Sequence, residues 1–268
     1  MTVLEFAGET HPGHHRETNQ DVIGWAIPSG VWLVADGMGG YASGDVASRI
    51  VKETVLKGAA EPDFALSAGL LKAHQSILAA VAEEPDRAGM GSTAVVVQIL
   101  DRRCRCAWCG DSRAYVWRAN KLERLTRDHS VLQGRVDAGE ISKTQALGQP
   151  DQNILTQALG KNEPRPDEVE MELRSCDWLV LCSDGLHDTL PDREIERVLK
   201  ASDSPSACTH ALMQRALELD AKDNVSVIVI RCPEYPDDPL PPAGNRRFWW
   251  IIAIAIAIAV AVAIATGS

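Results

Sequence analysis

The sequence contains no long basic stripe, and acidic residues outnumber basic ones. Lys and Arg number 27 against 37 Asp and Glu, which gives a formal net charge of −10. A nonspecific nucleic-acid binder needs clustered positive charge, so we expect no nucleic acid as partner. The first ten residues also lack an apolar run and include Glu5 and Glu9, which is not the pattern of a secretory signal.

A regular cysteine framework is lacking too. The seven cysteines are an odd number spread along the chain, which predicts reduced thiols in a cytosolic domain. Three of them form the pattern Cys104-x-Cys106-x-x-Cys109, yet no second Cys or His pair at zinc spacing lies nearby. Because Cys104 and Cys106 alternate along an expected strand, the pattern favours packing over zinc binding.

One long apolar run is present at the C-terminal end. Residues 248–265 are drawn only from Phe, Trp, Ile, Ala and Val. At about 1.5 Å per residue such a helix spans roughly 27 Å, close to the apolar thickness of a bilayer. Arg246 and Arg247 precede the run, and Trp249 and Trp250 open it, as at a membrane interface. We expect a single-pass anchor in the inner (cytoplasmic) membrane with the catalytic domain on the cytoplasmic side; a buried core helix is the alternative.

Prolines at 233, 236, 239, 241 and 242 precede this run and are typical of an extended spacer. The chain is therefore expected to consist of a globular domain over 1–232, a proline-rich linker over 233–247 and a transmembrane helix over 248–265.

The globular part is predicted to be α+β. Short runs rich in Val, Ile and Trp, bounded by turn residues, predict strands. They are Val22–Ile27, Val31–Ala35, Ala94–Leu100, Cys104–Cys109, Ala114–Arg118, Trp178–Cys182 and Val225–Arg231. Longer segments with helical spacing are Ala42–Leu56, Asp63–Val81, Asp192–Leu199 and Pro205–Leu219. Because most strands are adjacent in pairs, we expect antiparallel sheets with helices packed outside.

Four aspartates occupy a similar setting, beside glycine or at the end of an apolar run. Asp36 and Asp184 close strands and precede glycines, Asp111 follows Gly110, and Asp223 comes just before the last strand. Oxygen ligands of this kind favour Mg²⁺ or Mn²⁺ over zinc. A single Asp-Gly pair is ordinarily a turn, and spacing alone does not bring the four together.

The order of short motifs resembles the PP2C (PPM) family of metal-dependent serine/threonine protein phosphatases, particularly its bacterial members. The motifs are Arg16-Glu17-Thr18-Asn19-Gln20-Asp21, Val34-Ala35-Asp36-Gly37-Met38-Gly39-Gly40, Gly91-Ser92-Thr93, Gly110-Asp111-Ser112-Arg113, Leu125-Thr126-Arg127-Asp128-His129-Ser130, Ala158-Leu159-Gly160, Ser183-Asp184-Gly185-Leu186 and Asp223-Asn224-Val225-Ser226. Each motif alone is weak, but eight in this order over residues 10–231 are specific. The resemblance implies a four-layer αββα sandwich of two antiparallel sheets flanked by helices.

The resemblance also implies a site for two Mn²⁺ or Mg²⁺ ions, with a third in some bacterial relatives. Asp36 would bridge two ions, the Gly37 carbonyl would bind one, and Asp184 and Asp223 would hold the other. Asp111 with Asp184 matches the position of the third ion. Gln20 and Asp21 match residues that act through metal-bound waters, Arg16 matches a phosphate-binding arginine, and residues 131–156 match a variable flap.

The implied reaction is hydrolysis of phosphoserine or phosphothreonine on proteins by a metal-activated water. Met38 stands where animal members carry a histidine proposed as general acid, and bacterial members commonly share this methionine. Another group must then protonate the leaving oxygen, and His14, His15 and Tyr41 are weak candidates.

Other phosphatase classes are disfavoured by missing motifs. No cysteine is followed by arginine six residues later, Asp-x-Asp does not occur, and no Gly-x-x-x-x-Gly-Lys-Ser/Thr loop is present. Three alternatives remain: an inactive phosphoprotein-binding module at the membrane, a hydrolase of small phosphomonoesters, and a regulator domain of the same fold that dephosphorylates one dedicated partner. The expected partners are phosphoprotein substrates and a cognate serine/threonine kinase, and the resemblance allows a role in type VI secretion.

Overall fold

The computed structural model describes residues 4–39, 43–142, 145, 154–235 and 238. Contacts divide the chain into two units, residues 1–235 and 236–268. Apart from residues 233–235 and 238, the predicted linker and membrane anchor lie outside the described residues, and so does Tyr41. No helix within the described ranges is both long and apolar enough to cross a membrane.

The first sheet contains five antiparallel strands in the order β1-β11-β10-β7-β8. Its strands are β1 (Glu5–His11), β7 (Arg113–Arg118), β8 (Lys121–Arg124), β10 (Trp178–Cys182) and β11 (Val225–Arg231). The pairing of β1 with β11 brings the first and last strands of the unit side by side, from Glu5 opposite Arg231 to His11 opposite Val225.

The second sheet follows the order β2-β3-β5-β6-β9, and the short β4 also pairs with β3. Its strands are β2 (Asp21–Ala26), β3 (Val31–Met38), β4 (Gly91–Ser92), β5 (Ala94–Leu100), β6 (Arg103–Cys109) and β9 (Asp167–Glu172). Since β6 belongs to this sheet and β7 to the first, the Gly110–Ser112 turn carries the chain from one sheet to the other.

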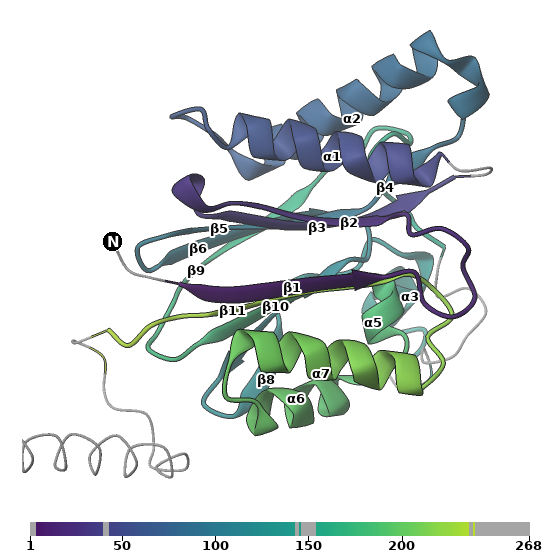
Figure 1. The fold of residues 1–268 in the computed structure, drawn as a ribbon. Helices are drawn as coiled ribbons and strands as arrows, with labels where there is room; N and C mark the ends of the chain where they lie inside the picture. Colours follow the sequence, from purple (N-terminus) through teal and green to yellow (C-terminus); the bar gives the residue numbers. More distant parts are fainter. Residues whose placement is uncertain (1–3, 40–42, 143–144, 146–153, 236–237, 239–268) are drawn as a thin grey trace, which may run out of the picture. The chain divides into compact units, whose positions relative to one another are not determined.

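The two sheets stack face to face with helices on both outer sides (Figure 1). One outer layer holds α1 (Gly44–Gly58) and α2 (Leu66–Glu83), and the other holds α6 (Asp192–Ala201) and α7 (Pro205–Glu218), with the short α5 (Asp184–His187) after β10. Single 3₁₀ turns occur at Ile27–Ser29 and Pro85–Arg87. The predicted α+β fold of two antiparallel sheets flanked by helices is confirmed.

The continuous apolar runs of the central strands follow from burial on both faces. In β3, Val31, Leu33 and Ala35 pack against the core beneath α1 and α2, whereas Trp32 and Val34 pack in the core between the sheets. A strand that is covered on both sides has no solvent face, so it needs no polar alternation. This layering holds the strand ends rigidly, and those ends carry the predicted site.

The three cysteines of the Cys104-x-Cys106-x-x-Cys109 pattern pack in the hydrophobic core, as the sequence predicts. Cys104 and Cys106 pack between the sheets, while Cys109 packs beneath α1 and α2 on the opposite face of the same sheet. The three thiols therefore do not converge on one point. Burial raises the pKa of Cys104 and of Cys109 to about 12, and no disulfide joins any of the seven cysteines, all of which are described.

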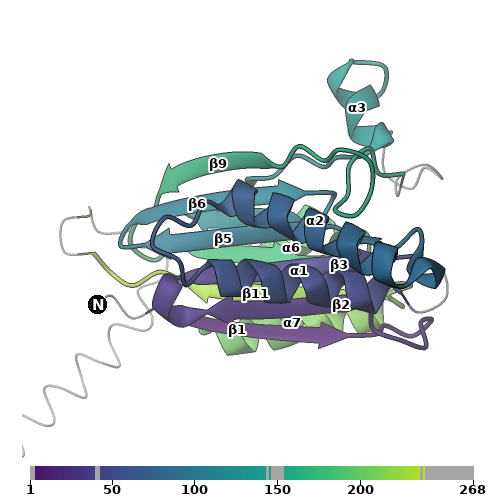
Figure 2. The same cartoon turned by 90° about the horizontal axis from the view of Figure 1, so that it is seen from above.

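Four strands (β1, β4, β8 and β9) and two helices (α5 and the helix Val131–Asp137) were not predicted from the sequence. The edge strand β9 alternates acidic residues with Val169 and Met171, which pack toward the core between the sheets. The β1 strand contains Gly8, which faces the side chains of Ile23 and Ile228 at close range. The predicted flap begins with α3 (Val131–Asp137), where Ser130 Oγ accepts a hydrogen bond from Gln133 N, and this helix stands outside the four layers (Figure 2).

Candidate active site

Five aspartates at or beside strand ends of the two sheets lie near enough for their charges to interact. They are Asp21, Asp36, Asp111, Asp184 and Asp223. In the second sheet, Asp21 and Asp36 are directly opposite each other in the β2–β3 register. In the first sheet, Cys182 is opposite both Arg113 and Val227, which places Asp184 near the turn before β7 and the turn before β11.

Polar contacts join the two sheets at this point. Ser183 Oγ donates to Asp21 Oδ2 at 2.6 Å, and Gln20 N donates to Asn224 Oδ1 at 2.8 Å. The Asn224 side chain also donates to the carbonyl oxygens of Pro12 and Thr18, at 3.0 Å each. The segment before β2 is therefore held in place by the turn before β11, more than 200 residues away in sequence.

Burial and the charges of neighbouring carboxylates raise the pKa of Asp21, Asp36, Asp111 and Asp184. Burial raises the pKa of Asp36 well above its ordinary value, and the charges of the other four aspartates add to this effect. Burial also raises the pKa of Asp111, with Asp184 as the largest charge effect. For Asp21 burial raises the pKa to about 7, and for Asp184 burial and then Asp188 raise it to about 6. Such a concentration of acid groups favours the binding of cations.

The donor set fits hard divalent cations. Every candidate side-chain ligand is a carboxylate oxygen, the type that Mg²⁺ and Mn²⁺ prefer. Asp21 Oδ1 and Asp184 Oδ1 are buried and have no hydrogen-bond partner, so a cation would satisfy oxygens that the protein leaves unpaired. Within the described part of the chain, however, no three His, Cys, Asp or Glu side chains are gathered closely enough to form a metal site.

Arg16 supplies positive charge at the edge of this cluster. Its Nε donates to Asp223 Oδ1 at 3.0 Å and its Nη2 donates to Asp223 Oδ2 at 2.7 Å. The bond to Asp223 raises the pKa of the guanidinium, and the charges of Asp184 and Asp36 act in the same direction. The predicted phosphate-binding residue and a predicted metal ligand are thus in direct contact.

Comparisons with known proteins show the family. Residues 6–225 match the family described as Protein phosphatase 2C. The chain belongs to this family. The serine/threonine phosphatase stp of Listeria welshimeri is 34% identical over 227 residues, which cover 81% of this chain and 90% of that relative. The chain is therefore a serine/threonine phosphatase of bacterial type.

Solved structures of two bacterial proteins superpose on the phosphatase. The catalytic domain of PstP in complex with two manganese ions gives a TM-score of 0.79 at 32% identity, covering 87% of this chain and 100% of that chain. PppA, described as a key regulatory component of T6SS in Pseudomonas aeruginosa, gives a TM-score of 0.74 at 32% identity, covering 85% and 97%.

Gly37 is required by the close approach of α1 to the site. A Cβ built at this position would lie 2.0 Å from the carbonyl oxygen of Gly44 and 2.7 Å from that of Gln20. Gly37 N donates to the Gln20 carbonyl at 3.1 Å, and Ser48 Oγ donates to the same oxygen at 2.6 Å. Gln20 thus links β3 to α1 through its backbone.

Two of the three candidate proton donors, His14 and His15, are bonded elsewhere. His14 Nε2 lies 3.2 Å from the carbonyl oxygen of Leu217, and His15 Nε2 lies 2.9 Å from Asp220 Oδ1. Met38 lies in β3 opposite Gly91. His14 thus contacts the last turn of α7 and His15 the segment that follows it, which gives each a structural partner.

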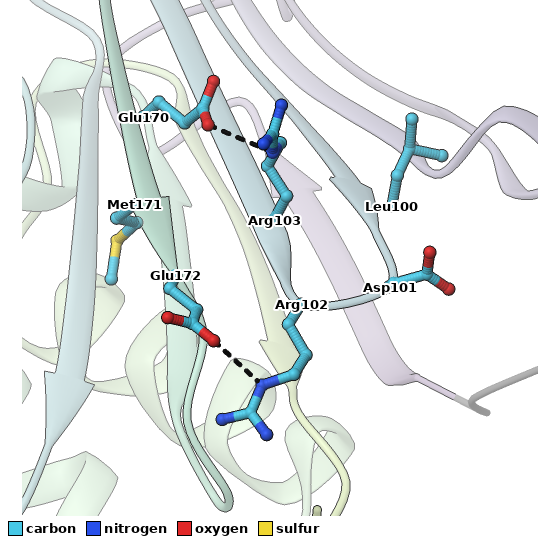
Figure 3. Close-up of a pocket in the computed structure, with 7 residues that line it drawn as sticks. All are labelled: Leu100, Asp101, Arg102, Arg103, Glu170, Met171 and Glu172. Carbon is cyan, nitrogen blue, oxygen red and sulfur yellow. Dashed lines mark ion pairs between the residues drawn. The ribbon is translucent and has the colours of Figure 1, made fainter.

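A cavity of about 330 Å³ borders the carboxylates. Its lining residues are Asp184, Gly185, Asp188, Thr189, Leu219, Asp220, Lys222 and Asp223. A second hollow of about 720 Å³ is lined by the β5–β6 turn and β9, where Arg103 and Arg102 pair with Glu170 and Glu172 (Figure 3). This hollow lies at the end of β5 away from the site, because β5 starts beside Thr93, which bonds the Asp36 carbonyl.

Several site residues of the phosphatase were missed by sequence reasoning. Ser183 and Asn224 lie inside the quoted motifs, but no role was assigned to them. His129 and His187 contact the backbone of the Gly110–Asp111 turn. The signal for Ser183, Asn224 and His129 was their place in a motif, whereas nothing in the sequence pointed to His187.

Proposed function

We propose that this phosphatase removes phosphate from phosphoserine and phosphothreonine on proteins with two, and up to three, Mn²⁺ or Mg²⁺ ions held at the aspartate cluster. The observation that carries the proposal is the set of five mutually repelling carboxylates with unpartnered buried oxygens on Asp21 and Asp184. The two manganese ions named for the PstP catalytic domain support the same assignment.

The positions of these residues suggest which of them would hold each metal ion. Asp36 and the Gly37 carbonyl lie at the end of β3, while Asp184 opens α5 just after β10 and Asp223 lies just before β11. These four would hold two ions, and Asp111 with Asp184 would hold the third.

Gln20 and Asp21 would support the ions from behind. The Gln20 backbone positions Gly37, and the Asp21 carboxylate is fixed by Ser183.

The phosphate dianion needs positive charge in order to approach a nucleophile. Bound divalent ions supply a nucleophilic water at neutral pH and neutralise the charge that develops on the phosphoryl oxygens. Arg16 would bind two phosphate oxygens through its planar guanidinium once its contacts with Asp223 are exchanged. Met38 has no proton to give, so the leaving oxygen must be protonated by another group.

Purified full-length protein tests this function directly. Matched phosphothreonine and phosphoserine peptides are compared with a small aryl phosphate, each with Mn²⁺ or Mg²⁺. We expect a higher kcat/KM on the peptides. A strong preference for small phosphoesters would indicate a small-molecule hydrolase, and phosphopeptide binding without turnover would indicate an inactive binding module.

We also propose that residues 248–265 anchor the phosphatase in the inner membrane, with the catalytic unit on the cytoplasmic side and residues 233–247 as spacer. The support is the eighteen-residue apolar run preceded by Arg246 and Arg247. Full-length protein should fractionate with membranes, and a variant ending at Tyr235 should remain in the soluble fraction and keep its peptide activity. Intact full-length protein found only in the soluble fraction would refute the anchor.

We propose that the phosphatase opposes a cognate serine/threonine kinase and acts in a type VI secretion assembly. The similarity to PppA supports this setting. Deleting the gene should raise threonine phosphorylation on membrane-associated secretion proteins, and complementation with active protein should reverse it. Unchanged phosphorylation of these proteins would remove the proposed setting and leave the phosphatase activity unaffected.

A further inference from the structure

The Gly110–Asp111 turn lies between two buried histidines. Gly110 N donates to His129 Nδ1 at 3.1 Å, and His187 Nε2 donates to the carbonyl oxygen of Asp111 at 3.0 Å. The His129 side chain is 7% exposed and that of His187 is 3% exposed. One histidine therefore holds the amide side of the turn, and the other holds its carbonyl side.

Each histidine also faces a carboxylate with its second ring nitrogen. His129 Nε2 lies 3.3 Å from Asp167 Oδ2, and His187 Nδ1 lies 3.2 Å from Asp188 Oδ1. The hydrogen bond to the turn therefore orients the His187 ring through Nε2, whereas Nδ1 lies near Asp188 without forming a hydrogen bond. Because Nε2 is engaged with a backbone carbonyl and the side chain is nearly inaccessible, His187 is poorly placed to protonate a leaving group.

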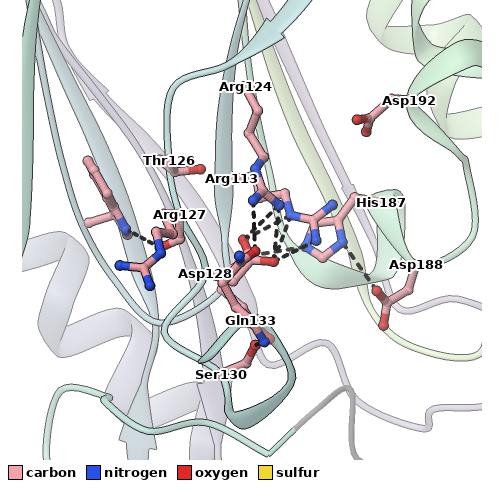
Figure 4. A network of polar contacts seen from close by, with 12 residues as sticks. Arg113, Arg124, Thr126, Arg127, Asp128, Ser130, Gln133, His187, Asp188 and Asp192 are labelled. Carbon is pink, nitrogen blue, oxygen red and sulfur yellow. Dashed lines mark hydrogen bonds and ion pairs between the residues drawn. The ribbon is translucent and has the colours of Figure 1, made fainter. Parts of the chain in front are cut away.

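A buried ion pair holds the chain on the far side of the turn. Arg113 Nη2 lies 2.6 Å from Asp128 Oδ2, with 18% and 9% of the two side chains exposed. Asp128, which Arg124 also contacts, directly precedes His129 in the sequence. Figure 4 shows His187 beside this Arg113–Asp128 pair. The turn can therefore shift only if several buried contacts break.

His187 and Asp184 belong to the same four-residue helix, α5. The β7–β10 register, with Arg113 opposite Cys182, brings this helix to the Asp111 turn. A bond from His187 to the Asp111 carbonyl consequently ties the backbone that carries the Asp111 side chain to the helix that carries Asp184.

We propose that His187 is a positioning residue that holds Asp111 beside Asp184 and so sets the affinity of the cation that these two carboxylates share. The inference rests on the assignment of Asp111 and Asp184 as a metal-binding pair under the proposed function. His187 acts through the backbone of the turn and does not itself ligate the ion.

The test compares two substitutions of His187 in the full-length protein. His187→Leu removes the donor, whereas His187→Gln supplies an amide that reaches a similar distance and donates to the same carbonyl. The matched control is His210→Leu, because His210 is an exposed histidine on α7 that faces Glu9. Mn²⁺ binding to each metal-free protein is measured by calorimetry and equilibrium dialysis, which report the number of ions and the affinity of each.

His187→Leu should weaken one ion by roughly 10- to 100-fold, as loss of a residue that orients a metal ligand typically does. His187→Gln should restore most of that affinity, and His210→Leu should match the parent protein. A His187→Leu protein with lowered thermal stability but unchanged metal affinities would show a merely structural role and overturn the proposal. If His187→Leu does not fold, His187→Asn replaces it, because its amide is too short to reach the carbonyl.

Asp111→Asn distinguishes an error in the positioning role of His187 from an error in the assignment of Asp111 as a metal ligand. This variant should lose the same ion that His187→Leu weakens. If Asp111→Asn loses an ion while His187→Leu binds normally, the positioning role is wrong and the metal assignment stands. If Asp111→Asn binds every ion as the parent protein does, the Asp111 assignment is wrong and the positioning role falls with it.

Discussion

Arg16 and Asp223 form a two-bond ion pair across 207 positions of the sequence, with N–O distances of 3.0 and 2.7 Å. Both carboxylate oxygens of Asp223 are engaged in this pair. A cation proposed to bind at Asp223 would compete with Arg16 for these oxygens. Release of Arg16 by such a cation would free the guanidinium to bind a phosphate. The structure thus links two predicted roles that the sequence presents as separate.

Arg16→Ala should have opposite effects on the two ligands. Loss of a charge-assisted contact to phosphate costs roughly 1.5–3 kcal/mol, so KM for a phosphopeptide should rise about tenfold to a hundredfold. Mn²⁺ affinity should rise by a smaller factor, roughly two- to tenfold, because the exposed pair is screened by solvent. Steady-state kinetics and metal titration measure the two effects.

Arg16→Lys is the control for charge, because lysine keeps the positive charge without the planar two-oxygen contact. Its KM should remain raised, while its Mn²⁺ affinity should stay closer to that of the parent protein. An unchanged KM in Arg16→Ala would show that Arg16 does not bind the phosphate.

The metal-free phosphatase should become less stable as pH rises from about 4 to about 7. The folded-state pKa of Asp21 is raised to about 7 and that of Asp184 to about 6, against an ordinary value of 3.8. In this window the folded protein keeps protons that the unfolded chain has released, so the free energy of unfolding falls with rising pH. Each kcal/mol lost lowers Tm by roughly 2–4 °C in a domain of this size.

Asp21→Asn isolates the carboxylate contribution. Burial lowers the pKa of His74, which by itself makes stability rise with pH below about 6.5, so the wild-type curve combines both trends. Thermal unfolding in EDTA at pH 5, 6, 7 and 8 should show a flatter decline for Asp21→Asn than for the parent protein. Parallel curves for the two proteins would contradict the raised pKa of Asp21.

Gly37→Ala should disrupt the site through sterics alone. Its Cβ would meet the Gly44 carbonyl oxygen at 2.0 Å, so α1 or the end of β3 has to move. We expect lower thermal stability and weakened Mn²⁺ binding. Gly134→Ala is the matched control, since Gly134 lies in α3 with no atom within 4 Å of a built Cβ. There the added methyl should stabilise the helix by up to about 1 kcal/mol.

The sequence predicted the fold class, the central strands and the position of each candidate aspartate at a strand end. These features are local, because a run such as Trp178–Cys182 identifies a buried strand and the following Asp184-Gly185 marks its end. The structure adds that Asp21 faces Asp36 in one register and that Ser183 bonds Asp21 across the sheets.

The missed elements have physical reasons. In β9 acidic side chains alternate with Val169 and Met171 on an edge strand, which resembles a polar loop in sequence. The contact of His187 with the Asp111 carbonyl joins positions 76 residues apart, and no local pattern encodes it. The pairing of Arg16 with Asp223 is equally nonlocal.

Asp36→Asn should abolish most activity because it removes a carboxylate proposed to hold the metal ions. We expect a drop of several orders of magnitude in kcat/KM, with fewer Mn²⁺ ions bound per chain. Asp86→Asn, in the 3₁₀ turn after α2, is the control and should retain full activity. Equal Mn²⁺ stoichiometry in Asp36→Asn and the parent protein would exclude Asp36 as a metal ligand.

The most direct test of metal-dependent phosphatase activity is hydrolysis of a phosphothreonine peptide by purified full-length protein, followed as free phosphate. The protein is first stripped of metal with excess EDTA, then dialysed and supplied with Mn²⁺ or Mg²⁺. The account predicts no turnover in EDTA and recovery of activity on addition of either Mn²⁺ or Mg²⁺. Full turnover in excess EDTA would contradict it.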